Sequence, residues 1–134
     1  MKKIFLILFL STLFFACEED KDKNPTPELA AQVAGTYRVT ELNVDGTNKP
    51  LDGAVITVQL DKFSAEVVTA KMKLKLDGVP EPDEDLGTLN LKNAGSTGVD
   101  IYEGTEKVGS VKSSKLNIFV VFDGQEIEMI ADKQ

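Results

Sequence analysis

The side chains that could do chemistry are few in this chain of 134 residues. It has no histidine and no tryptophan, and its one cysteine is Cys17. Nucleophile–base pairs usually need a histidine, and zinc sites use cysteine or histidine ligands. No glycine-rich phosphate loop stands between an expected strand and an expected helix. We therefore expect no catalytic residue, no metal site and no cofactor, and a protein that is not an enzyme.

A run of acidic residues in segment 77–85 is the other group with chemical potential. Glu81, Asp83, Glu84 and Asp85 could offer oxygen ligands to Ca²⁺. Their spacing is not that of an EF-hand, and two prolines and a glycine interrupt the segment. The pattern favours a solvent-exposed loop over a calcium site.

Cys17 lies at the end of an apolar N-terminal segment. Lys2 and Lys3 precede an apolar run over 4–10, which resumes at 13–15 and is too short to cross a bilayer as a helix. The pattern predicts a secretory signal peptide over 1–17. Ala16-Cys17 is similar to a lipobox, the bacterial motif in which the cysteine becomes the acylated first residue of a lipoprotein. The alternative is an ordinary signal peptide followed by a free cysteine.

Segment 18–26 is expected to be a disordered acidic tether. Its sequence Glu-Glu-Asp-Lys-Asp-Lys over 18–23 resembles the export signal that directs Bacteroidetes lipoproteins to the outer leaflet of the outer membrane. A tether whose charges serve only solubility is the alternative. Together the two segments predict a lipid-anchored, surface-exposed outer-membrane protein of the cell envelope. The formal net charge of −7 argues against nucleic acid as a partner.

Residues 27–134 are long enough for one domain, which begins with a short helix over 26–35. Thr26 could cap this helix, Pro27 suits its first position, and Gly35 could end it. Leu29 and Val33, four residues apart, give the helix one apolar stripe.

From residue 36 onward the hydrophobic period is two, which indicates strands. In the first strand the parity changes after Val39, which predicts a bulge near Thr40-Glu41. Asp123-Gly124 is the strongest hairpin signal in the chain. Short connections exclude βαβ crossovers, so we expect an all-β antiparallel up-and-down meander that closes into a small barrel, with a sandwich as the alternative. The expected strands are 36–44, 54–60, 63–76, 86–92, 99–102, 107–111, 116–122 and 125–131.

The helix followed by Ala34-Gly35-Thr36-Tyr37 and then a meander resembles the lipocalin-like and calycin-like β-barrel lipoproteins of Bacteroidetes. Segment 109–116 and Phe122-Asp123-Gly124 resemble the closing strands of the calycin-like group. The resemblance implies a cup-shaped barrel and no enzymatic activity.

The predicted lumen is nearly all aliphatic, so any ligand there would be small and apolar. Two function hypotheses follow: capture of such a ligand in the lumen, or a packed core in a module that engages another surface protein by its outer face or loops. The outer face has apolar members at Phe63, Ala65, Val67, Phe119, Val121 and Ile130, which the helix could partly cover. The candidate ligand-binding residues of the lumen are Tyr37, Val39, Ile56, Val58, Met72, Leu74, Leu89, Ile118, Val120 and Met129.

Overall fold

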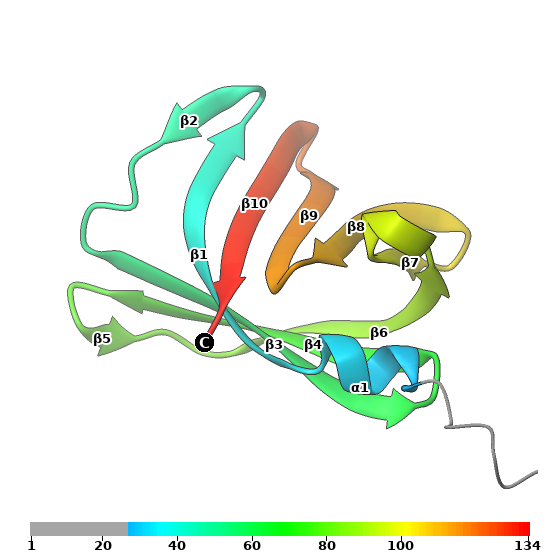
Figure 1. The fold of residues 1–134 in the computed structure, drawn as a ribbon. Coiled ribbons are helices and arrows are strands. Elements are labelled where there is room, and N and C mark those ends of the chain that lie inside the picture. The colour runs from blue at the N-terminus through cyan, green and yellow to red at the C-terminus, as the bar shows by residue number, and fades with distance from the viewer. Residues whose placement is uncertain (1–26) are drawn as a thin grey trace, which may run out of the picture.

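The computed structural model describes residues 27–134 and contains one short α-helix, one 3-10 turn and ten strands (Figure 1). The predicted signal peptide with Cys17, the predicted tether and Thr26 lie outside the described residues. Within 27–134 no helix is both long and apolar enough to cross a membrane. The elements are α1 (Leu29–Val33), β1 (Gly35–Val44), β2 (Thr47–Lys49), β3 (Ala54–Ser64), β4 (Val67–Leu76), β5 (Val79–Pro80), β6 (Glu84–Asn93), η1 (Gly95–Thr97), β7 (Val99–Glu103), β8 (Glu106–Lys112), β9 (Lys115–Phe122) and β10 (Gln125–Lys133).

Eight of the strands form a closed antiparallel barrel, in the order β1-β3-β4-β6-β7-β8-β9-β10. The last strand closes the ring because β10 pairs with β1 from Tyr37↔Lys133 to Val44↔Ile127. β2 and β5 are short additions that pair only with β1 and β4, respectively. The predicted all-β meander barrel of about eight strands is confirmed, and the sandwich alternative is wrong.

Two-residue turns in the left-handed region connect several neighbouring strands. Asp123 and Gly124 have φ values of 50° and 76° in the β9–β10 turn, so the predicted tight hairpin is confirmed. Asp45-Gly46 and Asp77-Gly78 show the same signs of φ in the β1–β2 and β4–β5 turns. Positive φ at both central residues matches the twist of the flanking strands, which explains the use of Asp-Gly at these positions.

The predicted bulge in β1 is confirmed. Pairing with β10 shifts between Val39 and Glu41, which leaves Thr40 as the extra residue. The bulge moves Leu42 onto the same face as Tyr37 and Val39. One extra residue therefore keeps the apolar side chains of a long strand inside the barrel.

The predicted boundary between the second and third strands is wrong. β3 continues through Asp61 and Lys62, and the turn falls at Ala65-Glu66. The backbone carbonyl of Ala65 accepts a hydrogen bond from Ala30 N–H (2.9 Å), and that of Glu66 accepts one from Leu91 N–H (2.8 Å). Because α1 and β6 hold this turn, its place is set by contacts distant in sequence.

The helix is shorter than predicted, and it packs on the barrel core where it was expected to cover part of the outer face. α1 has five residues, the side chain of its N-cap residue Glu28 makes no capping hydrogen bond, and Gly35 already belongs to β1. Ala30 and Val33 are fully buried in the barrel core, where α1 contacts β3, β4 and β6. The helix therefore closes one end of the barrel, and its stripe does not cover Phe63 on the outer face, which is 70% exposed.

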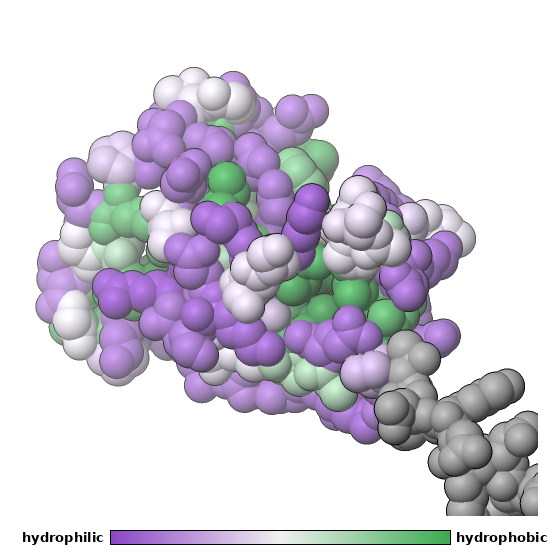
Figure 2. Space-filling view, in the orientation of Figure 1, coloured by the Kyte–Doolittle hydropathy of each residue, from purple (hydrophilic) through white to green (hydrophobic). Residues whose placement is uncertain are grey.

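Burial along the strands divides the barrel into two halves. Near α1 the inward side chains are buried, as for Val58 and Leu60 on β3. Toward the turns at 45–46 and 123–124 the inward side chains of the same strands are only partly buried, and Phe122 is 66% exposed. We call these parts the closed half and the open half of the barrel. In Figure 2 the visible face is mainly hydrophilic, with hydrophobic side chains in a hollow near α1 and beside the β2–β3 connection.

Candidate functional site: the open half and the gap between β8 and β9

The predicted lumen residues all lie on the inward face, but in two groups. Six are buried in the closed half or at its border: Tyr37, Val39, Val58, Leu89, Ile118 and Met129. Four are partly exposed in the open half: Ile56, Met72, Leu74 and Val120. The six buried residues pack against each other in the core. Only the four partly exposed residues can therefore contact a ligand while the barrel stays folded.

Tyr37 is the polar side chain of the closed half. It is fully buried, and its hydroxyl donates a hydrogen bond of 2.6 Å to the backbone carbonyl of Val33 at the end of α1. Burial raises the pKa of Tyr37 to about 12. The hydroxyl thus fastens the helix to the first strand and stays neutral at physiological pH, which is a structural role.

The barrel wall has a gap at the open half, where β8 and β9 diverge. These strands pair only from Lys112↔Lys115 to Gly109↔Ile118. Beyond that point, Glu106 and Lys107 of β8 pair with β7 alone, Val108 has no partner in the β7–β8 register, and β9 residues 119–122 pair with β10 alone. We call the facing edges 106–108 and 119–122 the β8–β9 gap.

Two features of β8 explain where the pairing stops. Gly109 lies so close to β9 that a Cβ atom there would collide with the backbone carbonyl of Asn117. The next residue, Val108, is the extra residue of a bulge, because the β7–β8 register shifts between Ile101 and Tyr102. A bulge bends the strand that carries it, so β8 turns away from β9 there.

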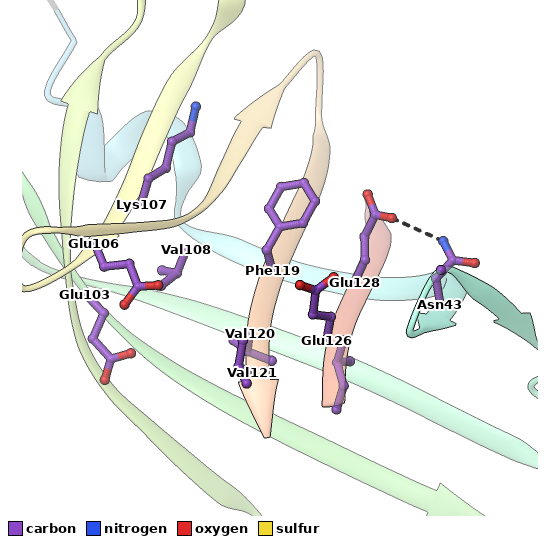
Figure 3. Close-up of a pocket in the computed structure, with 12 residues that line it drawn as sticks. Asn43, Glu103, Glu106, Lys107, Val108, Phe119, Val120, Val121, Glu126 and Glu128 are labelled. Carbon is purple, nitrogen blue, oxygen red and sulfur yellow. Dashed lines mark hydrogen bonds between the residues drawn. The ribbon is translucent and has the colours of Figure 1, made fainter. Parts of the chain in front are cut away.

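A pocket of about 520 Å³ lies at the β8–β9 gap (Figure 3). Its apolar members come from both faces of the wall, because Val120 and Ile127 point inward while Phe119 and Val121 lie on the outer face. Phe119 is 46% exposed and Val121 is 70% exposed. The lining residues are Asn43, Gly46, Glu103, Glu106, Lys107, Val108, Phe119, Val120, Val121, Glu126, Ile127 and Glu128.

Four carboxylates border this pocket, two from each side of the gap. Glu103 and Glu106 face each other directly across the β7–β8 hairpin, an arrangement that costs stability. Glu126 and Glu128 come from β10. Figure 3 shows the two pairs on opposite sides of the apolar side chains of β9.

The one lysine of the pocket does not neutralise these carboxylates. Lys107 points away from Glu103 and Glu106 (Figure 3), and its ammonium group pairs with Asp100 at 2.9 Å on the outer face. The other two ion pairs in residues 27–134 join Lys62 to Glu28 and Lys115 to Asp132. Among residues 27–134, the negative charge of the pocket is therefore uncompensated.

Glu128 is held by amides from both neighbouring strands. It accepts hydrogen bonds from Asn43 (3.3 Å) and from Asn117 (3.2 Å). The side-chain oxygen of Asn117 is buried and has no hydrogen-bond partner among the described residues. Asn117 stands immediately before Ile118, the last β9 residue that pairs with β8, so its side chain lies beside the point at which β8 and β9 separate.

The acidic segment 77–85 is folded more than predicted. It contains β5, and it provides the first residues of β6. All its residues are exposed, and Asp85 accepts a hydrogen bond from the backbone N–H of Gly87 (2.8 Å). Among residues 27–134, no group of three or more Asp, Glu, His or Cys side chains is arranged to hold a metal ion.

Sequence reasoning named Phe119, Val120 and Val121 as apolar surface or lumen residues, but it missed the carboxylates of the pocket. The one local signal for them was the pair of glutamates that flank Gly104-Thr105 in a hairpin, because like charges directly opposite each other destabilise a sheet. Glu126 and Glu128 come from another hairpin and reach the same pocket only after the barrel closes.

The fold and this site define the class of protein: a closed eight-stranded antiparallel β-barrel, plugged by a helix at one end and open at the other. Comparison with protein families, with curated proteins and with solved structures gives no match.

Proposed function

We propose that this protein is a non-enzymatic, lipid-anchored module of the cell envelope that engages another protein through the open half of its barrel. The observation that carries the proposal is the pocket at the β8–β9 gap, which joins exposed apolar side chains to uncompensated carboxylates. A partner surface can satisfy both kinds of group at once. A small apolar ligand would leave four carboxylates beside it, and burying charge without a partner is costly.

The filled closed half supports the same function. Tyr37, Leu60, Ile101 and Leu116 are at most 1% exposed, so the lumen near α1 is occupied by the protein's own side chains. A filled core gives a rigid scaffold, and rigid scaffolds commonly present binding groups at their ends and loops.

The anchor is the part of the proposal that rests on the sequence. Lipid attached to Cys17 would hold the domain at a membrane surface, since each buried CH₂ contributes about 0.8 kcal/mol. Cys17→Ser should release the protein from the membrane fraction or leave it uncleaved. A mutant that is processed and stays membrane-bound like the wild type would contradict lipidation.

Site-specific photo-crosslinking on intact cells tests the partner directly. A photoreactive residue replaces Val121 in one variant and Phe63 in its control, since both side chains are 70% exposed and Phe63 lies on the outer face of β3. We expect a discrete protein adduct from position 121 and none from position 63. Equal adducts from both positions, or none from position 121, would refute the proposal.

A second candidate function has its own support. The open half is lined by inward aliphatic side chains that are partly exposed, including Ile56, Met72 and Val120, and these could hold a small apolar ligand. Saturable binding of a hydrophobic fluorescent probe that weakens in Met72→Ala would favour this candidate.

A further inference from the structure

We propose that the partner binds at the β8–β9 gap by strand addition, as an extended basic segment of another protein chain that pairs with the free edge of β9. This inference rests on the proposed function and names the partner's chemistry and its mode of binding. Three observations carry it: free backbone edges, apolar side chains beside them, and a surrounding negative charge.

The backbone of the gap offers hydrogen bonds that the barrel itself does not use. Residues 119–122 of β9 are paired along one edge by β10, and their other edge faces 106–108 of β8 without pairing to it. An exposed strand edge is a template for another strand, since its N–H and C=O groups are already aligned. The ring of eight strands is closed by strand pairing, and the gap is a place in its wall where two neighbouring strands part.

The side chains beside this edge suit a peptide with alternating character. Val120 and Phe122 point inward, while Phe119 and Val121 point outward, so both faces of an added strand would meet apolar groups. Carboxylates also stand on both sides, with Glu103 and Glu106 on the β7–β8 hairpin and Glu126 and Glu128 on β10. Lysine or arginine side chains on an added strand could therefore reach a carboxylate from either face.

Charge decides between the possible occupants. A second copy of this chain would bring a formal net charge of −7 to a pocket that is already negative. An acidic or uncharged segment would leave Glu103 and Glu106 opposed with nothing to relieve their repulsion. A basic segment removes that repulsion on binding, so its affinity should fall as salt concentration rises.

Peptide binding to the purified domain 27–134 and to the full mature chain tests the inference. The probe is an alternating lysine–valine octapeptide, measured by calorimetry at low and physiological salt. Its matched controls are the glutamate–valine octapeptide and a lysine–valine octapeptide N-methylated on alternate residues, which cannot form one row of strand hydrogen bonds. We expect binding of the first peptide alone, with amide exchange slowed at 119–122.

Variants of the domain test whether the carboxylates of the pocket, and not the overall charge or fold, determine peptide binding. Glu103→Gln/Glu106→Gln should weaken binding by roughly threefold to tenfold, because two carboxylates lose their charge. Glu66→Gln/Glu81→Gln removes the same charge from exposed positions away from the pocket and should leave binding unchanged.

The outcomes separate this inference from the proposed function. Equal binding of the N-methylated or the acidic peptide, or no binding of the lysine–valine peptide, overturns strand addition by a basic segment. Self-association of the domain that Val121→Arg abolishes also overturns it, since the gap would then hold a second copy. In each case an adduct from position 121 to a different protein would leave the proposed function standing, and its absence would refute that function separately.

Discussion

The two halves of the barrel are built from the same strands but differ in how far their inward side chains are covered. In the closed half, α1 covers the lumen, and side chains such as Leu60 and Val33 are almost entirely buried. In the open half, no helix covers the lumen in the described residues, β8 and β9 diverge, and inward residues such as Phe122 are exposed. Figure 1 shows α1 at one end and the β1–β2 and β9–β10 hairpins at the other.

The contrast between the two halves indicates that the residues that stabilise the fold lie at one end of the strands and the candidate binding residues at the other. Apolar groups in the closed half exclude water and stabilise the fold, at about 1.5–3 kcal/mol for each fully buried large side chain. The open half gives up part of that burial and places like charges together, both of which cost stability. Features that cost stability and persist at one end of a scaffold are typical of a binding surface.

The largest expected effect contrasts one inward residue from each half. Leu60→Ala should lower the free energy of unfolding by about 2–5 kcal/mol, because it leaves a cavity in a filled core. Met72→Ala should cost only about 1–2 kcal/mol, since Met72 is partly exposed and solvent can fill the space. Urea denaturation of both variants measures the difference. Equal losses would show that the two halves are packed alike and would remove the basis of the comparison.

The next effect is a pH dependence that belongs to the closed half. Burial raises the pKa of Tyr37 to about 12 from its ordinary value of 10.0. The folded protein therefore keeps this proton more strongly than the unfolded chain. The resulting stability is fully present below pH 10 and is lost as pH rises toward 12, by roughly 2–3 kcal/mol.

Tyr37→Phe isolates this contribution. We expect the variant to lose about 1 kcal/mol at neutral pH, with the hydrogen bond to Val33, and to show a smaller fall in stability between pH 10 and 12 than the wild type. Tyr102→Phe changes the chain's other tyrosine, which is only partly buried, and serves as the matched control. If Tyr37→Phe lost as much stability between pH 10 and 12 as the wild type, Tyr37 would not be the source of the pH dependence.

The smallest effect concerns the hairpin that forms part of the open half. Gly124 has a φ of 76° and no atom near the position of an added Cβ, so a substitution there meets backbone strain alone. Gly124→Val should lower the free energy of unfolding by about 1 kcal/mol, and Gly124→Asn by less, because asparagine tolerates this region better. Thermal melts of both variants decide the matter. A neutral valine variant would argue against the β9–β10 register and thus against the position of Val121 in the pocket.

Several elements could be predicted from local sequence because their causes are local. The Asp123-Gly124 turn needs positive φ, and the parity change after Val39 needs one extra residue in β1. The failures have distant causes. The β3–β4 turn at Ala65-Glu66 is held by Ala30 and Leu91, and α1 ends at Val33 because the next residues are extended and Gly35 pairs with Leu60 of β3.

By itself, the sequence determined the all-β class, the eight barrel strands and which side chains face inward, because a period of two is a property of each strand alone. It also gave the N-terminal signal pattern, which the described residues do not include. Only the tertiary structure decided that the lumen is filled at one end and open at the other. It also decided where β8 and β9 part, and that Glu103 and Glu106 share a pocket with two glutamates of β10. Strand pairing in the folded barrel brings these groups together, and the point where β8 and β9 part depends on a glycine–bulge pair in β8. No local pattern specifies either.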